Sequence, residues 1–187
     1  GFPCALAAAT RHEIVGYDIS PRAAEILKEC KYPHREDGAQ KLLEKTSLRI
    51  VNTIHEAVSH GDIIFVAVET PHKPEFEGIT RMPKHRSDFD YTTLRSACET
   101  VARVAKEMKK TIVLVVISTV LPGTSKREIY PVLNEYTKYI YNPFFIAMGT
   151  TIHDYLYPEM VLIGCDDKDR AALELVQKFY EHHTSSP

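Results

Sequence analysis

The chain has 187 residues and a formal net charge of −2, and 44% of its residues are hydrophobic and 26% charged. These are ordinary values for one globular domain, and the small net charge gives no electrostatic case for nucleic acid or an anionic membrane as a partner. No apolar run reaches the roughly 20 residues that span a bilayer, and no signal peptide is visible. We therefore expect a cytoplasmic protein without membrane contact.

Four cysteines are scattered along the chain without any CxxC pair: Cys4, Cys30, Cys98 and Cys165. This pattern is typical of reduced thiols and predicts neither a disulfide framework nor a zinc site. His182-His183 near the C-terminus is best interpreted as a solvated helix end, because no partner ligands stand at a fixed spacing. We predict no metal site.

Apolar runs and amphipathic segments alternate along the first half of the chain. Ser20-Pro21 marks the start of a helix, with Ser20 as N-cap and Pro21 at the first helical position. In order, the pattern predicts a helix, a strand, two helices, a strand, a helix and a buried strand: residues 4–10, 12–17, 21–30, 39–45, 48–51, 54–60 and 63–68.

The second half continues this alternation after a long loop over 72–89. That loop is basic and could approach a phosphate, although a solvated loop explains it equally well. Beyond it, the pattern predicts a helix, a strand, a helix, a strand, an irregular segment, a strand and a helix: residues 91–109, 112–117, 124–135, 139–141, 142–158, 160–163 and 167–182. Such alternation predicts an α/β fold with a doubly wound parallel sheet. An α/β sandwich with no particular ligand is the alternative.

Polar residues follow three of the predicted strands. They are Asp18, Glu69-Thr70-Pro71 and Ser118-Thr119. Ligands of open α/β sheets bind beyond the carboxyl ends of the strands, so these groups predict one edge of a ligand crevice. The alternative is that serine and threonine are turn formers at these positions.

The start of the chain matches the later part of a dinucleotide-binding fingerprint, which consists of a strand, GxGxxG, a helix, a second strand and an acidic residue. Gly1 would be the third glycine, so the first strand and two glycines are absent. Asp18 would accept hydrogen bonds from the adenosine ribose and favour NAD, and Arg22 lies just beyond it. A solvated strand-end carboxylate explains Asp18 equally well.

Taken together, the motifs make the chain resemble the N-terminal domain of the UDP-glucose/GDP-mannose dehydrogenase family. The motifs cover nearly the whole chain in the family's order: Gly1-Phe2-Pro3, Gly16-Tyr17-Asp18, 65–71 (FVAVETP), Ser118-Thr119-Val120, Pro122-Gly123-Thr124, Asn142-Pro143 and 154–164 (DYLYPEMVLIG).

The resemblance implies that the chain is the NAD-binding domain of an enzyme that oxidises the C6 alcohol of a UDP- or GDP-sugar to a uronate. On this basis we expect a Rossmann-like sheet lacking its first strand, with NAD as the cofactor. Residues 1–187 would be an N-terminally truncated NAD-binding domain, without the dimerisation helix and the C-terminal domain that holds the nucleotide sugar. We expect the full-length protein to be a homodimer and this part alone to be inactive.

The resemblance assigns roles residue by residue. It implies cofactor contacts by Gly1, Asp18, Arg22, Thr70, Pro71, Ser118 and Thr119. Thr119 would also be catalytic, because the family's threonine helps to hold water near the reacting carbon. Asn142 would begin the loop that crosses toward the sugar, followed by Phe144 and Phe145.

This chain departs from the family pattern at that loop. Phe144 and Met148 stand where the family has glutamates, and Ile117 replaces a lysine before the Ser-Thr pair. Phenylalanine cannot exchange a proton, so the group credited with assisting thioester hydrolysis is absent. A degenerate, non-catalytic α/β binding module of the same ancestry is therefore the alternative. An oxidation that stops at the aldehyde is a further one.

Overall fold

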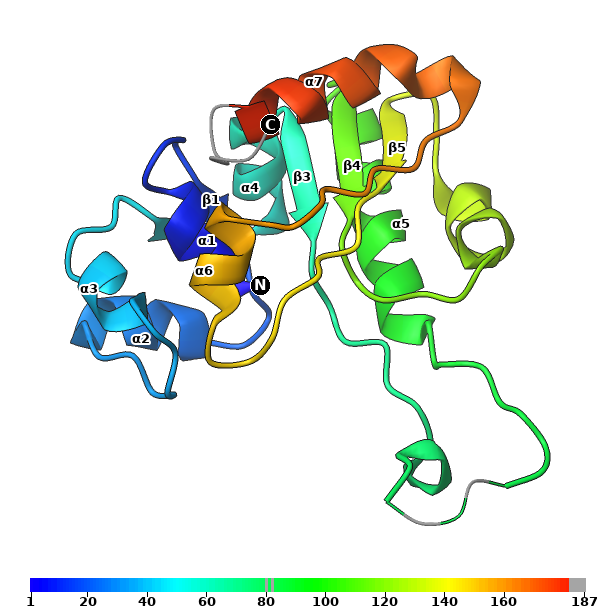
Figure 1. Cartoon of the computed structure of the whole chain (residues 1–187). Helices are drawn as coiled ribbons and strands as arrows, with labels where there is room; N and C mark the ends of the chain where they lie inside the picture. The colour runs from blue at the N-terminus through cyan, green and yellow to red at the C-terminus, as the bar shows by residue number, and fades with distance from the viewer. Residues whose placement is uncertain (80, 82, 182–187) are drawn as a thin grey trace.

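The parallel sheet of this protein is divided into two parts. In the computed structural model, a three-stranded part has the order β3 (Ile63–Val66), β4 (Ile112–Val116), β5 (Thr137–Tyr141), and a two-stranded part pairs β1 (Val15–Gly16) with β2 (Arg49–Ile50). Every strand pair is parallel, which confirms the predicted α/β class. No described strand lies between β1 and β3 (Figure 1). The structure describes residues 1–79, 81 and 83–181.

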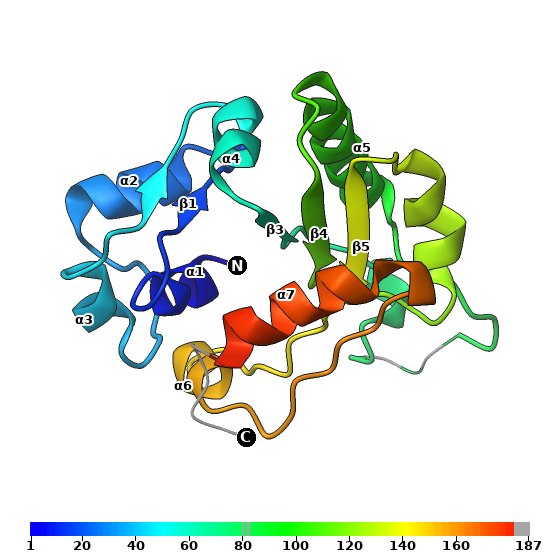
Figure 2. The ribbon, with the colours of Figure 1, turned by 90° about the horizontal axis from the view of Figure 1, so that it is seen from above.

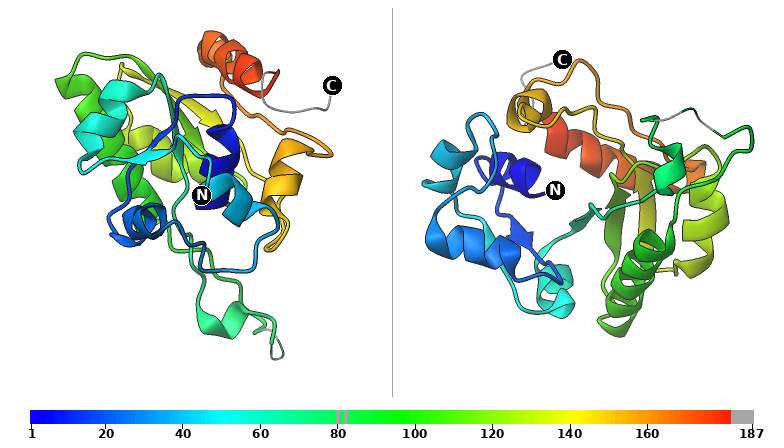
Figure 3. Two further views of the ribbon diagram at one scale, coloured as in Figure 1. Left: turned by 90° about the vertical axis from the view of Figure 1, so that its left-hand side faces the viewer. Right: turned by 90° about the horizontal axis from the view of Figure 1, so that it is seen from below.

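Helices cover both faces of the three-stranded part, and others surround the two-stranded part. Figures 2 and 3 show α5 on one face of β3–β5 and α7 on the other, with α1, α2 and α3 beside β1. Among the described residues the α-helices are α1 (Phe2–Ala8), α2 (Arg22–Glu29), α3 (Ala39–Leu43), α4 (Ile54–His60), α5 (Thr92–Glu107), α6 (Thr151–Leu156) and α7 (Arg170–Glu181). Short helical turns occupy Pro74–Phe76, Ser125–Ile129, Tyr130–Val132 and Asp167–Asp169.

β4 is the centre of the core because its side chains alternate between the two helical layers. Leu114 packs in one hydrophobic cluster with Leu94 and Val101 of α5. Val115 packs in a second cluster with Val176 of α7. All five residues of β4 are buried, as expected for a parallel strand covered on both faces.

α4 has capping contacts at both ends. Thr53 and Glu56 form a capping box at its start, where each side chain accepts a backbone N–H. The ammonium of Lys110 donates to the carbonyl oxygens of Val58, Ser59 and Gly61 at its end, at 3.1, 2.9 and 2.9 Å. These bonds satisfy terminal carbonyls that have no partner inside the helix.

Two predictions between 142 and 163 are wrong. The segment predicted to be irregular contains α6, and the strand predicted over 160–163 is absent. The residues on either side of this stretch, Tyr141 and Gly164, form an isolated antiparallel bridge. α6 forms because Glu36, distant in sequence, accepts the N–H groups of Gly149 and Ile152 at 3.0 and 3.3 Å. A local pattern cannot reveal such a contact.

Other predicted elements are present but shorter. The helix predicted over 124–135 is a π-helical turn followed by a 3₁₀ turn that ends at Val132. Pro131 lies in that 3₁₀ turn, and its missing N–H prevents regular continuation. The strands predicted over 12–17 and 48–51 shrink to two residues each. His182 and His183 lie outside the described residues.

Among the described residues, no helix is both long enough and apolar enough to cross a membrane.

Candidate functional site

The carboxyl ends of β3 and β4 meet the start of α1. Gly1 is the N-cap of α1, and a Cβ added to it would lie 3.3 Å from Cβ of Ala67, just after β3. That distance is tighter than most real Cβ contacts, so a larger residue would press the helix away from the strand. The glycine therefore allows the close approach of α1 to Ala67, which a larger side chain would reach only with a shift of a few tenths of an ångström.

Two hydroxyls join the strand ends at this edge. Ser118 is buried; its Oγ donates to the Val68 carbonyl at 2.7 Å and accepts the Val68 N–H at 3.1 Å. Thr70 Oγ1 donates to the Thr119 carbonyl at 2.8 Å. Ser118 and Thr70, both predicted to contact a cofactor, thus hold the β3 and β4 ends together.

Thr119 is exposed, and its hydroxyl has no hydrogen-bond partner within the described chain. It lies directly after Ser118, on the turn that Thr70 supports, and Pro71 follows Thr70 on the neighbouring turn. The structure therefore places Thr119 at the strand edge with its hydroxyl available to a ligand. This is the placement that a role in catalysis or cofactor binding requires.

Asp18 and Arg22 lie at the end of β1 and the start of α2. Asp18 is exposed, and its Oδ1 accepts the Ser20 N–H at 2.8 Å. Ser20 Oγ accepts the Arg22 N–H at 3.3 Å, although the N-cap of α2 is Pro21 rather than the predicted Ser20. These contacts fix the turn and leave the second Asp18 oxygen, Oδ2, without a bonded partner in the described chain.

The side chain of Arg22 turns toward a neighbouring loop rather than toward Asp18. Its Nη2 lies 3.1 Å from Nε2 of His34. Arginine can only donate, so the ring nitrogen of His34 is the acceptor in this contact. Sequence reasoning missed His34 because nothing in the local pattern connects it to α2.

The predicted substrate loop is divided between the interior and the surface. Asn142 is 1% exposed; its Nδ2 donates to the Leu162 carbonyl at 2.8 Å, and its Oδ1 accepts the hydroxyl of Tyr180. Phe144 packs against Tyr155 with ring centroids 5.2 Å apart, whereas Phe145 is 56% exposed. The Asn142 side chain is therefore occupied within the fold, whereas Phe145 faces outward, as do Ile146 and Met148 of the same loop.

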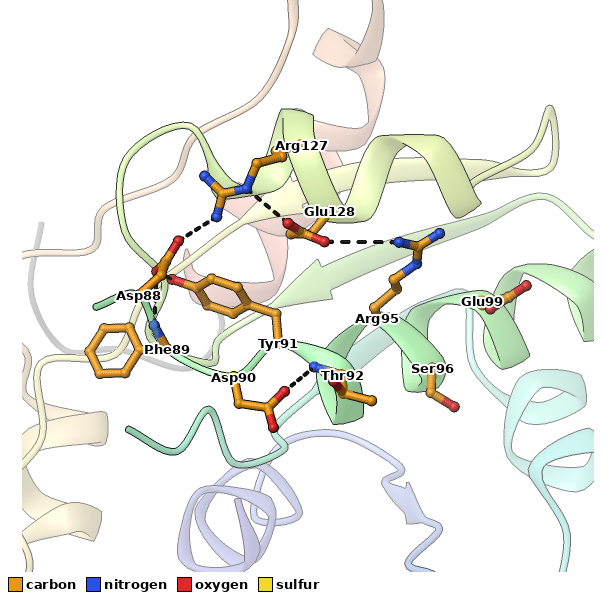
Figure 4. A pocket seen from close by; sticks show the side chains of 10 residues that line it. All are labelled: Asp88, Phe89, Asp90, Tyr91, Thr92, Arg95, Ser96, Glu99, Arg127 and Glu128. Atoms are coloured by element: carbon orange, nitrogen blue, oxygen red, sulfur yellow. Dashed lines mark hydrogen bonds and ion pairs between the residues drawn. The ribbon is translucent and has the colours of Figure 1, made fainter. Parts of the chain in front are cut away.

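A pocket of about 570 Å³ lies beside the start of α5 and faces the helical turn after β4 (Figure 4). Four carboxylates and two guanidinium groups line it: Asp88, Asp90, Glu99 and Glu128, with Arg95 and Arg127. Arg127 lies between Asp88 and Glu128, and its Nε donates to Glu128 at 2.8 Å. Sequence reasoning missed this pocket because its ion pairs join segments far apart in the chain.

No group of three or more histidine, cysteine or acidic residues that could hold a metal ion occurs among the described residues.

A comparison with family models matches residues 1–184 to the NAD-binding domain of the UDP-glucose/GDP-mannose dehydrogenase family. The chain belongs to this family. Its cofactor is NAD, and the predicted Rossmann-like fold is confirmed. The close packing of Gly1 against Ala67 and the free Oδ2 of Asp18 are compatible with that cofactor, because the third glycine of the fingerprint brings helix and strand together and its acidic residue faces the adenosine ribose.

Curated relatives include a GDP-mannose 6-dehydrogenase of Pseudomonas syringae pv. syringae, 30% identical over 182 residues, which cover 91% of this chain and 39% of the relative. UDP-glucose 6-dehydrogenase 5 of Oryza sativa subsp. japonica is 28% identical, over 91% of this chain and 35% of the relative. The chain thus spans well under half the length of these relatives.

Solved structures agree with this family. A ternary complex of GDP-mannose dehydrogenase from Pseudomonas aeruginosa superposes with a TM-score of 0.85 at 26% identity, over 100% of this chain and 43% of that one. A UDP-glucose dehydrogenase from Pyrobaculum islandicum gives 0.82 at 26% identity, over 98% and 42%.

Proposed function

We propose that residues 1–187 are the NAD-holding domain of a nucleotide-sugar 6-dehydrogenase, which oxidises the C6 alcohol of a UDP- or GDP-sugar to a uronate. The observation that carries this proposal is the family match over residues 1–184. The relatives named as sugar-nucleotide dehydrogenases are more than twice as long as this chain. The nucleotide sugar would therefore be bound mainly by parts of the complete protein outside residues 1–187.

The cofactor would extend along the carboxyl edge from the end of β1 to the end of β4. Asp18 would accept a ribose hydroxyl through Oδ2, with Arg22 beside the adenosine end. Gly1 would let α1 pack closely against the sheet, so that the start of α1 lies beside the pyrophosphate. When bound, NAD supplies the acceptor for the hydride that leaves C6. Thr119 would orient a water molecule or the reacting alcohol beside the nicotinamide through its free hydroxyl.

Calorimetric titration of the complete protein with NAD tests this arrangement. We expect binding that Asp18→Ala weakens about tenfold, the effect of losing one hydrogen bond to a charged acceptor. Glu25→Ala on the exposed side of α2 is the matched control and should leave the affinity unchanged. Absence of heat at millimolar NAD would contradict the proposal.

The loop after β5 supports a second candidate, a non-catalytic module of the same ancestry. Residues 142–149 carry no carboxylate. Two carboxylates from outside the loop bond its backbone: Asp154 accepts the Ala147 N–H and Glu36 the Gly149 N–H, each at 3.0 Å. A loop without a proton-exchanging group favours either no turnover or an oxidation that stops at the aldehyde.

Product analysis separates these possibilities. The complete protein, NAD and a panel of UDP- and GDP-sugars are incubated, and both NADH and the sugar product are measured. Uronate with two NADH per sugar supports the full oxidation. Aldehyde with one NADH supports the arrested reaction, and no NADH with any sugar supports the non-catalytic module.

The oligomeric state and the cellular location of the complete protein are part of the same proposal. The complete protein would be a homodimer in the cytoplasm. Four free cysteines support a reducing compartment. Light scattering on the complete protein measures its mass, and a monomeric mass would contradict the assembly.

A further inference from the structure

The turn that carries Thr119 is held by tyrosine hydroxyls. The Leu121 N–H donates to the hydroxyl oxygen of Tyr91 at 3.2 Å, and the Val120 N–H lies 3.4 Å from the hydroxyl oxygen of Tyr141. Thr70 fixes the Thr119 carbonyl from the other side at 2.8 Å. The backbone that follows the Thr119 Cα is therefore anchored from three different parts of the chain.

The hydrogen bond between Leu121 and Tyr91 has only one possible donor, the Leu121 N–H. Tyr91 donates its single hydroxyl proton to Oδ1 of Asp88 at 2.7 Å, so its oxygen is left to accept from Leu121. Arg127 in turn donates to Oδ2 of the same carboxylate. A series of hydrogen bonds thus links Leu121 through Tyr91 to Asp88, which accepts from both Tyr91 and Arg127. Figure 4 shows the part of this series from Tyr91 to Arg127.

The tyrosine ring itself has little freedom. Tyr91 is 6% exposed, and the guanidinium of Arg127 lies 5.9 Å from its ring centroid. The ring of Phe89 lies against it edge-on with centroids 6.3 Å apart. The hydrogen bond from Tyr91 is the largest cause that holds the pKa of Asp88 below its usual value, with smaller contributions from Phe89 and Arg127. At neutral pH the carboxylate is therefore charged and the series of hydrogen bonds intact.

We propose that Tyr91 is a positioning residue for the nicotinamide end of the cofactor site, acting through the turn at Leu121 and held in place by Asp88 and Arg127. This inference rests on the proposed function, because it takes Thr119 to face the nicotinamide. Asp18 and Gly1 lie on other elements, so the adenosine end does not depend on Tyr91.

The test compares two ligands on the complete protein. NAD reaches both ends of the site, whereas ADP-ribose lacks the nicotinamide. Tyr91→Phe removes the hydroxyl but keeps the ring. We expect it to weaken NAD binding about tenfold, as for one lost hydrogen bond, and to leave the affinity for ADP-ribose unchanged.

Tyr130→Phe is the matched control. Tyr130 also has a carboxylate, that of Asp166, at its hydroxyl, but none of the hydrogen bonds to residues 119–121 in the described chain comes from it. Tyr130→Phe should change neither the affinity for NAD nor the affinity for ADP-ribose. Asp88→Asn keeps an acceptor for Tyr91 and should retain most of the NAD affinity, whereas Asp88→Ala should resemble Tyr91→Phe.

Amide hydrogen exchange without ligand gives an independent readout. Tyr91→Phe should speed exchange over residues 119–122 and leave β4 unchanged, and this result would be obtained whether or not NAD binds. If the wild-type protein bound neither ligand, the proposed function would fail and exchange alone would decide the role of Tyr91. Equal weakening of both ligands, or unchanged exchange at 119–122, would overturn the inference. Urea midpoints verify that each variant folds.

Discussion

β3 and β4 are two apolar strands of similar composition, but they differ in how many of their residues are buried. All five residues of β4 are buried, whereas Val66 is the one buried residue of the four in β3. β4 lies between β3 and β5, while the other edge of β3 faces β1 with no described strand between them. The number of neighbouring strands, and not composition alone, therefore decides how deeply a strand is buried.

The two parts of the sheet are consequently stabilised in different ways. The three-stranded part contains a two-sided core and buried polar bonds at its strand ends. The two-stranded part has strands of two residues each, and side-chain contacts such as those of Glu36 and Lys110 connect its surroundings to the rest of the fold. Substitutions at buried bonds of the three-stranded part should cost more than matched substitutions in the two-stranded part.

Asn142 should show the largest difference. Asn142→Ala removes two hydrogen bonds of a side chain that is 1% exposed, one to the Leu162 carbonyl and one from the Tyr180 hydroxyl, so we expect a loss of about 3 kcal/mol in the free energy of unfolding. Asn52→Ala, on an exposed turn after β2, should cost less than about 0.5 kcal/mol. Urea denaturation of both variants measures the two losses in free energy of unfolding. Equal losses would contradict the expected difference between the two parts of the sheet.

Lys110 joins the end of α4 to the loop after α5. Lys110→Met keeps the aliphatic stem but removes three charge-assisted bonds, so about 2 kcal/mol of stability should be lost. Lys106→Met removes only an exposed ion pair to Glu135 and should cost about 0.5 kcal/mol or less. If the two losses were the same, the carbonyls that end α4 would not need Lys110.

Ser118 tests the bond between the ends of β3 and β4. Ser118→Ala leaves the Val68 N–H without its partner, and we expect a loss of about 1.5 kcal/mol. Ser47→Ala near the two-stranded part removes one weak exposed contact of 3.4 Å to Ala9 and should be nearly neutral. Thermal melts provide the measurement. A neutral Ser118→Ala would show that the strand ends are held by other contacts.

Thiol reactivity gives the smallest and most local contrast. Burial raises the pKa of Cys98 to about 12 and that of Cys4 to about 11. At pH 8 both thiols should therefore stay protonated and resist alkylation, whereas exposed Cys30 should react first. Mass spectrometry of iodoacetamide-treated protein identifies the order. Early labelling of Cys4 would show that solvent reaches the core between the two parts of the sheet.

The local sequence pattern was enough to predict the elements that are determined by their own residues. The run at 112–117 and the helix at 54–60 are predicted correctly because the first is apolar throughout and the second has its own capping box. α6 could not be predicted, because Glu36 supplies acceptors from a distant segment. The predicted strand at 160–163 is absent because only Gly164 reaches the edge of β5.

The candidate site could be predicted as a set of strand ends, but individual roles could not. The sequence places Asp18, Thr70, Ser118 and Thr119 at one edge, and the structure agrees that each lies after a strand. Only side-chain geometry distinguishes Ser118, whose hydroxyl bonds Val68, from Thr119, whose hydroxyl is available. The Asn142 side chain, assigned to the substrate loop, is likewise occupied inside the fold.

Amide hydrogen exchange of the complete protein, with and without NAD, tests most directly that the cofactor lies along the carboxyl edge. We predict slower exchange with NAD at three segments: 18–22, 67–71 and 119–122. β5 and the outer face of α7 should be unchanged. Protection confined to regions outside these three segments, or no protection at saturating NAD, would contradict the proposed site.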